Sequence, residues 1–310
     1  MNFAALKIAV CSVATAVVLC GGGNSFAAQI FLQPPAAPRE TLCEHLYTQL
    51  SSRATAANSG DFINSNFQVV SNFWLRDVKN ILGNSQGRFL SADGSITIYA
   101  AAVTPIAPHF CIGAAHAGGL QISNAFWTLP DGTFYTNGGA VRGGTLQEII
   151  ISGTDIAITL TAKTNAFFLK YLPDISGKVP YCRNGNVAAN PAPVFVRFHL
   201  TPSLGWPHTS WISAGNGAGG FGGNDTMWGT PKFGDYSHGD LGIGGDSGGA
   251  AFAIINNEAV IVGCMTSGSY HPAIWQHADE INAAMSALCV TNGLPIEQLT
   301  PCDLSQFPDL

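Results

Sequence analysis

Short apolar runs dominate the hydrophobic pattern from Ile96 onward. They are rich in Val, Ile, Phe and Thr and are broken by Gly, Pro, Asn and Asp, which is typical of antiparallel β-sheet. Because no helical pattern separates them, a sandwich or a pair of barrels is favoured over an α/β fold. The expected strands are 95–103, 109–114, 148–152, 155–161, 193–200, 249–255 and 258–267.

Two segments have helical spacing instead. Thr41-Leu-Cys-Glu44 matches a capping box ahead of leucines on one face, which predicts a helix over about 41–55 after the stiff linker Pro34–Pro38. Residues 273–288 also recover an amphipathic pattern, which predicts a helix that closes the β region.

The beginning of the chain has the pattern of a signal peptide. Lys7 precedes an apolar run over Ile8–Leu19, and Ser25 and Ala27 give the small-x-small pattern of a cleavage site after residue 27. Lipoprotein processing at Cys20 is a weaker alternative, because a bulky residue precedes the cysteine. We therefore expect a secreted protein, extracellular or, in a Gram-negative source, periplasmic, with no membrane span.

Composition narrows the classes of partner. The net charge of −6 becomes −7 without Lys7, and no basic run occurs, so nucleic acid is not an expected partner. No CxxC pair occurs, so the cysteines lack zinc-site spacing, and we expect neither a metal nor a cofactor.

Six cysteines remain after the signal, an even number that favours disulfides in an exported chain. The sequence leaves all pairings open. Cys289 with Cys302 is the preferred bond, since it would hold the tail to the preceding helix. Cys111 and Cys264 lie in apolar strands and are equally compatible with buried free thiols.

The segment Gly244-Gly-Asp-Ser-Gly-Gly-Ala250 is the strongest indication of chemistry. A serine hydroxyl needs a neighbouring base and N–H donors for the oxyanion when it attacks a carbonyl. Ser247 is the candidate nucleophile, and the amides of Gly245 and Ser247 are the candidate donors, because glycine allows the close approach and unusual dihedrals. The structural alternative is a Gly/Ser turn between strands.

Two residues upstream of Ser247 are candidates for the base and for the acid that orients it. His116 in Cys111-Ile-Gly-Ala-Ala-His-Ala117 ends an apolar strand and is the candidate base, whereas the other seven histidines are interpreted as structural. Asp155 in Thr154-Asp-Ile-Ala-Ile-Thr-Leu160 is a single carboxylate at a strand start, and it gains meaning only beside the other two.

Together these segments resemble the trypsin/chymotrypsin-like serine peptidase family, in a bacterial-type, secreted form. The family shows Ala-Ala-His, Asp-Ile-Ala and Gly-Asp-Ser-Gly-Gly in this order and at comparable spacing. The resemblance implies an all-β fold of two packed antiparallel β-barrels with a C-terminal helix, here with an N-terminal helical extension. It implies that His116 takes the proton of Ser247 and that Asp155 orients His116.

The resemblance also locates the pocket for the side chain before the scissile bond. No acid lies at its floor, so a preference for small or medium apolar side chains is expected over Lys or Arg. Thr266, in place of the family's serine, could donate to Asp155. The implied pocket residues are Leu241, Gly242, Thr266, Ser267, Gly268 and Ala273.

Several features depart from the family. Ala117 replaces the cysteine that usually follows the histidine, and no Ile-Val-Gly-Gly-like activation sequence precedes the first barrel, so the partner of Asp246 is in doubt. The expected organisation is a signal peptide 1–27, an extension or pro-segment 28–88, a peptidase domain 89–290 (barrels about 60–165 and 175–272, closing helix 273–288) and a tail 291–310.

Three other interpretations compete with a peptidase acting on proteins or peptides. An α/β-hydrolase is disfavoured, because the β-only pattern of the chain lacks the helices that alternate with strands in that fold. A catalytically inactive protease-like binding or adhesion protein remains the main alternative. Asp235, His238 and Asp240 could hold a metal, but such residues in a Gly-rich loop are usually solvated.

Overall fold

The structure is a computed structural model. It describes residues 39–53, 73, 75–81, 88–90, 96–98, 103–117, 126–128, 134–136, 141–142, 145–162, 164, 167–175, 177–179, 194–201, 206–215, 227–229, 247–265 and 271–310. The predicted signal peptide 1–27, Cys182 and Asp246 lie outside these residues.

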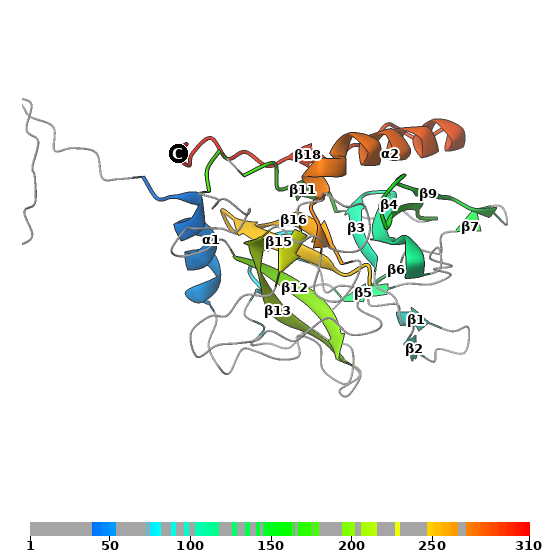
Figure 1. The fold of residues 1–310 in the computed structure, drawn as a ribbon. Helices are drawn as coiled ribbons and strands as arrows, with labels where there is room; N and C mark the ends of the chain where they lie inside the picture. The colour runs from blue at the N-terminus through cyan, green and yellow to red at the C-terminus, as the bar shows by residue number, and fades with distance from the viewer. Residues whose placement is uncertain are drawn as a thin grey trace, which may run out of the picture. The chain divides into compact units, whose positions relative to one another are not determined.

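The first main sheet has the strand order β3-β4-β10-β9, and all its pairs are antiparallel (Figure 1). Every residue of its three longer strands is buried, because the sheet is covered on both faces. Its strands are β3 (Val103–Ala107), β4 (Phe110–Ala114), β9 (Glu148–Ile150) and β10 (Ile156–Leu160).

The second main sheet has the order β17-β14-β13-β12-β15-β16-β11-β18. Its pairs are antiparallel except those of β11 with β16 and β18. Asn256 and Asn257, both at positive φ, form the tight turn between β15 and β16, a conformation that asparagine tolerates well. Its strands are β11 (Lys170–Tyr171), β12 (Val194–Thr201), β13 (Trp206–Gly215), β14 (Met227–Gly229), β15 (Ala250–Ile255), β16 (Glu258–Cys264), β17 (His271–Pro272) and β18 (Thr300–Pro301).

Six short strands pair outside the two main sheets, as three antiparallel hairpins. They are β1 (Arg88–Leu90) with β2 (Ile96–Ile98), β5 (Phe126–Thr128) with β6 (Phe134–Thr136), and β7 (Val141–Arg142) with β8 (Thr145–Leu146).

Helix α1 (Leu42–Ser51) lies close to its predicted span. Thr41 accepts from the backbone N–H of Glu44, and Glu44 accepts from that of Thr41, so the predicted capping box is present. Three leucines on one face are fully buried and pack on β12 and β15. These are Leu42, Leu46 and Leu50.

The closing helix differs from its predicted bounds. Residues Ile274–His277 form a short 3-10 helix, η3, and the α-helix α2 runs over Ala278–Asn292. Gly293 ends α2 at φ 64, where glycine carries no steric penalty. α2 packs on β10 and lies above β4 and β9 in Figure 1.

One core joins both sheets. It contains Ile112 and Ile158 of the first sheet, Phe252 and Ile261 of the second, and Met285 of α2. The expected all-β fold, with its C-terminal helix and N-terminal helical extension, is confirmed. The strand pairings of the described residues leave both sheets open. Within the same residues, no helix is long and apolar enough to cross a membrane.

The disulfide prediction is wrong for Cys289 and Cys302, which are both free thiols. Cys289 belongs to the core between α2 and the two sheets, whereas Cys302 packs in a separate cluster with α1 and the tail. Side chains directed into different clusters cannot meet at bonding distance. Cys43, Cys111 and Cys264 are also buried and free.

Candidate active site

The register of the first sheet places His116 and Asp155 at the same end of it. Ala114, the last residue of β4, is opposite Ile156, the first residue of β10. The backbone N–H of Ala115 donates to the carbonyl oxygen of Asp155 at 2.7 Å. A short 3-10 turn, η2 (Ala115–Ala117), then carries His116 over the strand end.

Asp155 binds His116 through both of its oxygens. The backbone N–H of His116 donates to Oδ1 at 2.7 Å, and Nδ1 of the ring contacts Oδ2. Because a carboxylate can only accept, this contact assigns the proton of a neutral ring to Nδ1 and leaves the lone pair on Nε2. The Asp155 side chain is 5% exposed and that of His116 is 42% exposed, so the buried acid orients a ring that solvent can reach.

Ser247 comes from the second sheet, just before β15. Its Oγ lies 2.8 Å from Nε2 of His116. Gly248 follows at φ 90, a conformation that residues with a side chain rarely adopt, and its N–H donates to the carbonyl of Met265 at 2.7 Å. This turn fixes Ser247 at the end of the second sheet, facing the end of the first.

The Cys264 thiol lies close enough to Asp155 for the carboxylate charge to affect its pKa. Burial raises the pKa of the Cys264 thiol well above its usual range, and the negative charge of Asp155 raises it further. The thiol is therefore protonated and does not compete with Ser247 as a nucleophile.

The structure describes only part of the remaining predicted site. Ala273 is fully buried, and a bridge pairs it with Gly263 at the end of β16. The other predicted oxyanion and pocket residues lie outside the described part of the chain: Gly245, Leu241, Gly242, Thr266, Ser267 and Gly268.

Metal binding has no support in the described residues, where no group of three His, Cys, Asp or Glu side chains could hold an ion. Asp235, His238 and Asp240, which the sequence left open as a metal site, lie outside them.

A second histidine and carboxylate form a pair that the sequence analysis missed. Glu297 accepts from the backbone N–H of His109 at 3.1 Å, and its other oxygen contacts Nδ1 of the ring. Nε2 of His109 lies 3.0 Å from Oγ1 of Thr164. The sequence carries no signal for this pair, because 188 residues separate its members.

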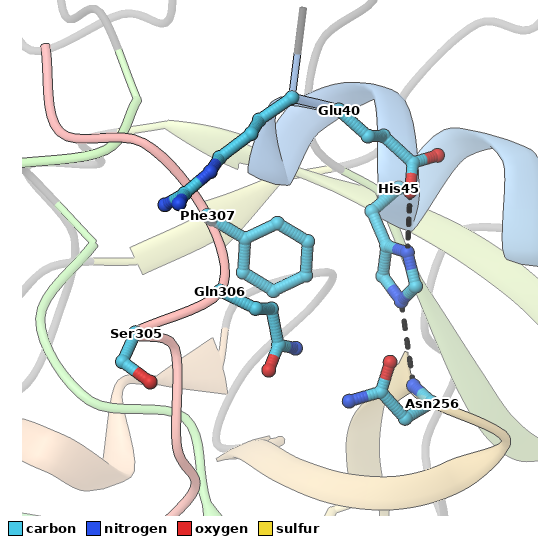
Figure 2. Close-up of a pocket in the computed structure, with 7 residues that line it drawn as sticks. Glu40, His45, Asn256, Ser305, Gln306 and Phe307 are labelled. Atoms are coloured by element: carbon cyan, nitrogen blue, oxygen red, sulfur yellow. Dashed lines mark hydrogen bonds and ion pairs between the residues drawn. The ribbon is translucent and has the colours of Figure 1, made fainter. Parts of the chain in front are cut away.

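A pocket lies beside Asn256 (Figure 2). Asn256 follows β15, whereas Ser247 precedes this strand. His45 is buried in it with both ring nitrogens engaged: Nδ1 lies 3.0 Å from a carboxylate oxygen of Glu40, and Nε2 accepts from the N–H of Asn256 at 3.3 Å. With the length of β15 between them, this pocket cannot receive a peptide bond held at Ser247. It is lined by Arg39, Glu40, His45, Asn256, Ser305, Gln306 and Phe307.

Comparison with known proteins gives structural neighbours but no relative by sequence. No family model and no curated protein matches the chain. Among solved structures, the chain is similar to "Kallikrein-related peptidase 10", with 13% sequence identity and a TM-score of 0.41. The match covers 66% of this chain and 98% of that one.

Proposed function

We propose that the chain is a serine endopeptidase. The observation that supports this best is the continuous contact from Asp155 through His116 to Oγ of Ser247, joining the ends of two separate sheets. Three residues that the sequence motifs nominated together meet in the order that nucleophilic catalysis requires.

In the proposed reaction, Oγ of Ser247 attacks the carbonyl carbon of the scissile bond while its proton passes to Nε2 of His116. Asp155 holds the Nδ1 proton and stabilises the imidazolium that forms. His116 then gives the proton to the leaving amine, and the carbon–nitrogen bond breaks to leave an acyl group on Ser247. Water, deprotonated by His116, releases the acid by the reverse sequence.

The amides of Gly245 and Ser247 are proposed to hold the oxyanion. The positive φ of Gly248 supports this assignment, because it shows that the turn after the nucleophile already has a glycine-dependent shape. Protein or peptide chains are the proposed substrates, and the apolar segment at the start of the sequence supports a secreted enzyme.

The described residues 39–53 and 75–81 are proposed to form a permanent brace and not part of a removable pro-segment. Arg53 donates to Asp77 and to the side chain of Asn257 at the β15–β16 turn, at 3.1 and 2.6 Å. The N–H of Lys79 donates to the carbonyl of Asn257 in this turn, and the carbonyl of Lys79 accepts from the N–H of Ala259 in β16. Removing the buried leucines of α1 would cost about 2–5 kcal/mol each, so loss of the whole segment should unfold the domain.

The N-terminus of the active protein tests the brace. We expect Edman or mass-spectrometric sequencing to find a start upstream of Arg39. If activity instead appeared only on cleavage before an Ile or Val near residue 90, the brace proposal would be wrong.

A fluorophosphonate probe tests the proposed chemistry. It should label wild-type protein at Ser247, and Ser247→Ala should remove that label while keeping the fold, as checked by circular dichroism. A folded wild-type protein that does not react would instead support the binding or adhesion interpretation.

A further inference from the structure

The C-terminal segment crosses from one sheet to the other beside His109. In Figure 1 the red tail runs back from the end of α2 past β18. Glu297 of this tail binds His109, in the turn between β3 and β4 of the first sheet. Only three residues later, β18 pairs with β11 of the second sheet, a span of at most about 10 Å along an extended chain.

The tail is fixed on both sides of this crossing. The N–H of Leu294 donates to the carbonyl of Cys289 at the end of α2. The side chain of Asn282 donates to the carbonyl of Leu299 at 3.0 Å and accepts from its N–H at 2.7 Å, as a paired peptide would. After β18, the N–H of Cys302 donates to the carbonyl of Tyr171 at 2.9 Å.

The segment after β10, which leads to the second sheet, also contacts His109. The N–H of Thr161 donates to the carbonyl of His109 at 2.7 Å, and Oγ1 of Thr164 contacts its ring. Within the described residues, Glu297 is the charged group in contact with His109. The side chain of Glu297 is 9% exposed, so its oxygens depend on the backbone N–H and the ring of His109 for hydrogen bonds.

His109 and His116 flank the two ends of β4, and this relation connects the crossing to the site. The shared core holds the sheets together through contacts that have no preferred direction. A charged hydrogen bond is directional, so it can fix how β4 is inclined toward the second sheet. A change in that inclination would move His116 away from Ser247.

We propose that Glu297 and His109 are positioning residues that fix the first sheet against the second and so set the contact between His116 and Ser247. The inference rests on the proposed peptidase function for its kinetic consequences. Its structural consequence, a His116–Ser247 contact that depends on Glu297, does not require turnover.

The kinetic test uses Glu297→Gln and His109→Ala in the full mature chain. Each should lower kcat and the rate of fluorophosphonate labelling about tenfold, because a small displacement of the base costs rate while binding is kept. KM should stay within about twofold. The double variant should be no slower than either single variant, because both remove one interaction.

Three further variants sharpen the kinetic test. His109→Asn keeps an N–H donor near the position of Nδ1 and should restore most of kcat. Asp309→Asn, which breaks the 2.7 Å ion pair of the same tail with Lys178 but does not involve the first sheet, is the matched control and should leave kcat unchanged. If Glu297→Gln does not fold, Glu297→Asp can replace it, because its carboxylate is one methylene too short to keep both contacts with His109. Its kcat and labelling rate are then compared with those of the wild type.

The structural test is the ¹⁵N resonance of Nε2 of His116. Ser247→Ala gives its value without the Ser247 hydrogen bond, and Glu297→Gln should move the wild-type resonance toward that value. A lower melting temperature with unchanged kcat, labelling rate and resonance would overturn the inference. A wild-type protein that neither cleaves nor labels would contradict the proposed function, while the resonance would still decide on Glu297.

Discussion

Two histidines at opposite ends of β4, His116 and His109, are held by the same set of contacts. In each, the backbone N–H donates to one oxygen of a buried carboxylate and Nδ1 contacts the other. In each, Nε2 lies 2.8 or 3.0 Å from a hydroxyl oxygen. Hydrogen-bond geometry alone therefore does not assign a catalytic role to either histidine.

The surroundings of the two histidines differ. The side chain of His116 is 42% exposed, whereas that of His109 is 13% exposed. Ser247 begins a glycine turn that enters a strand, whereas Thr164 lies in the linker between the sheets. Access for a substrate and a backbone shaped to hold an oxyanion are what a catalytic site adds.

Removing the side chains of the set that contains Ser247 should give the largest effect. Ser247→Ala, His116→Ala and Asp155→Asn should each lower kcat/KM by at least about 10⁴, and the losses should not add, because the three act as one unit. Peptide cleavage assays measure the loss, with melting temperature as the control for folding. Wild-type turnover by Ser247→Ala would refute the assignment.

The hydroxyl of Thr164, beside His109 and Glu297, should not react as a nucleophile. In Ser247→Ala, fluorophosphonate labelling at Thr164 should be at least about a thousandfold slower than labelling of Ser247 in the wild type, because Asn165 follows Thr164 where Gly248 follows Ser247. Peptide mapping by mass spectrometry locates the label. Rapid modification of Thr164 would mean that the two sets are functionally equivalent.

Specificity should follow the surroundings of Ser247. The buried methyl of Ala273 makes the proposed pocket shallow, so side chains such as Ala, Val, Leu or Met before the scissile bond are expected. Each methylene-sized misfit should cost about 10–200-fold in kcat/KM. A peptide library measures the preference, and dominant cleavage after Arg or Lys would assign Asp240 to the pocket.

The smallest expected effect is on the pH dependence of the free energy of unfolding, and it comes from a buried thiol. Burial raises the pKa of Cys302 to about 12, from 9.0 for a free thiol. The folded state therefore keeps a proton that the unfolded state loses, so this contribution is complete below pH 9 and is lost as the pH rises toward 12. Cys302→Ala should reduce the slope of unfolding free energy against pH by up to about 1.4 kcal/mol per unit. Urea denaturation between pH 8 and 11 measures it, and an unchanged slope would contradict the prediction.

The sequence predicted the strands with continuous apolar runs and not those whose pairing depends on distant partners. The expected strands 109–114, 155–161 and 249–255 match β4, β10 and β15 within one residue at each end. β13 was not predicted, because Pro207 and polar residues interrupt its pattern, although it pairs with β12 along eight residues. Tertiary pairing outweighed local propensity there.

The candidate site was predictable to a different degree. Short local motifs nominated His116, Asp155 and Ser247, and the structure brings these three together. The predicted Cys289–Cys302 bond was wrong, because the number of cysteines indicates the redox compartment but not where each side chain points. Glu297 could not be found, since a glutamate after a helix is common and its partner is 188 residues away.

The contact between His109 and Glu297 also bears on the stage of synthesis at which the proposed active site can form. Every strand of the first sheet, and all of the second except β18, precede Glu297 in the chain, so they leave the ribosome before their crossing segment exists. Contacts over such separations form late in folding. A nascent chain whose tail has not emerged from the ribosome should therefore react slowly with a fluorophosphonate, so the proposed peptidase activity would develop only after the tail is made.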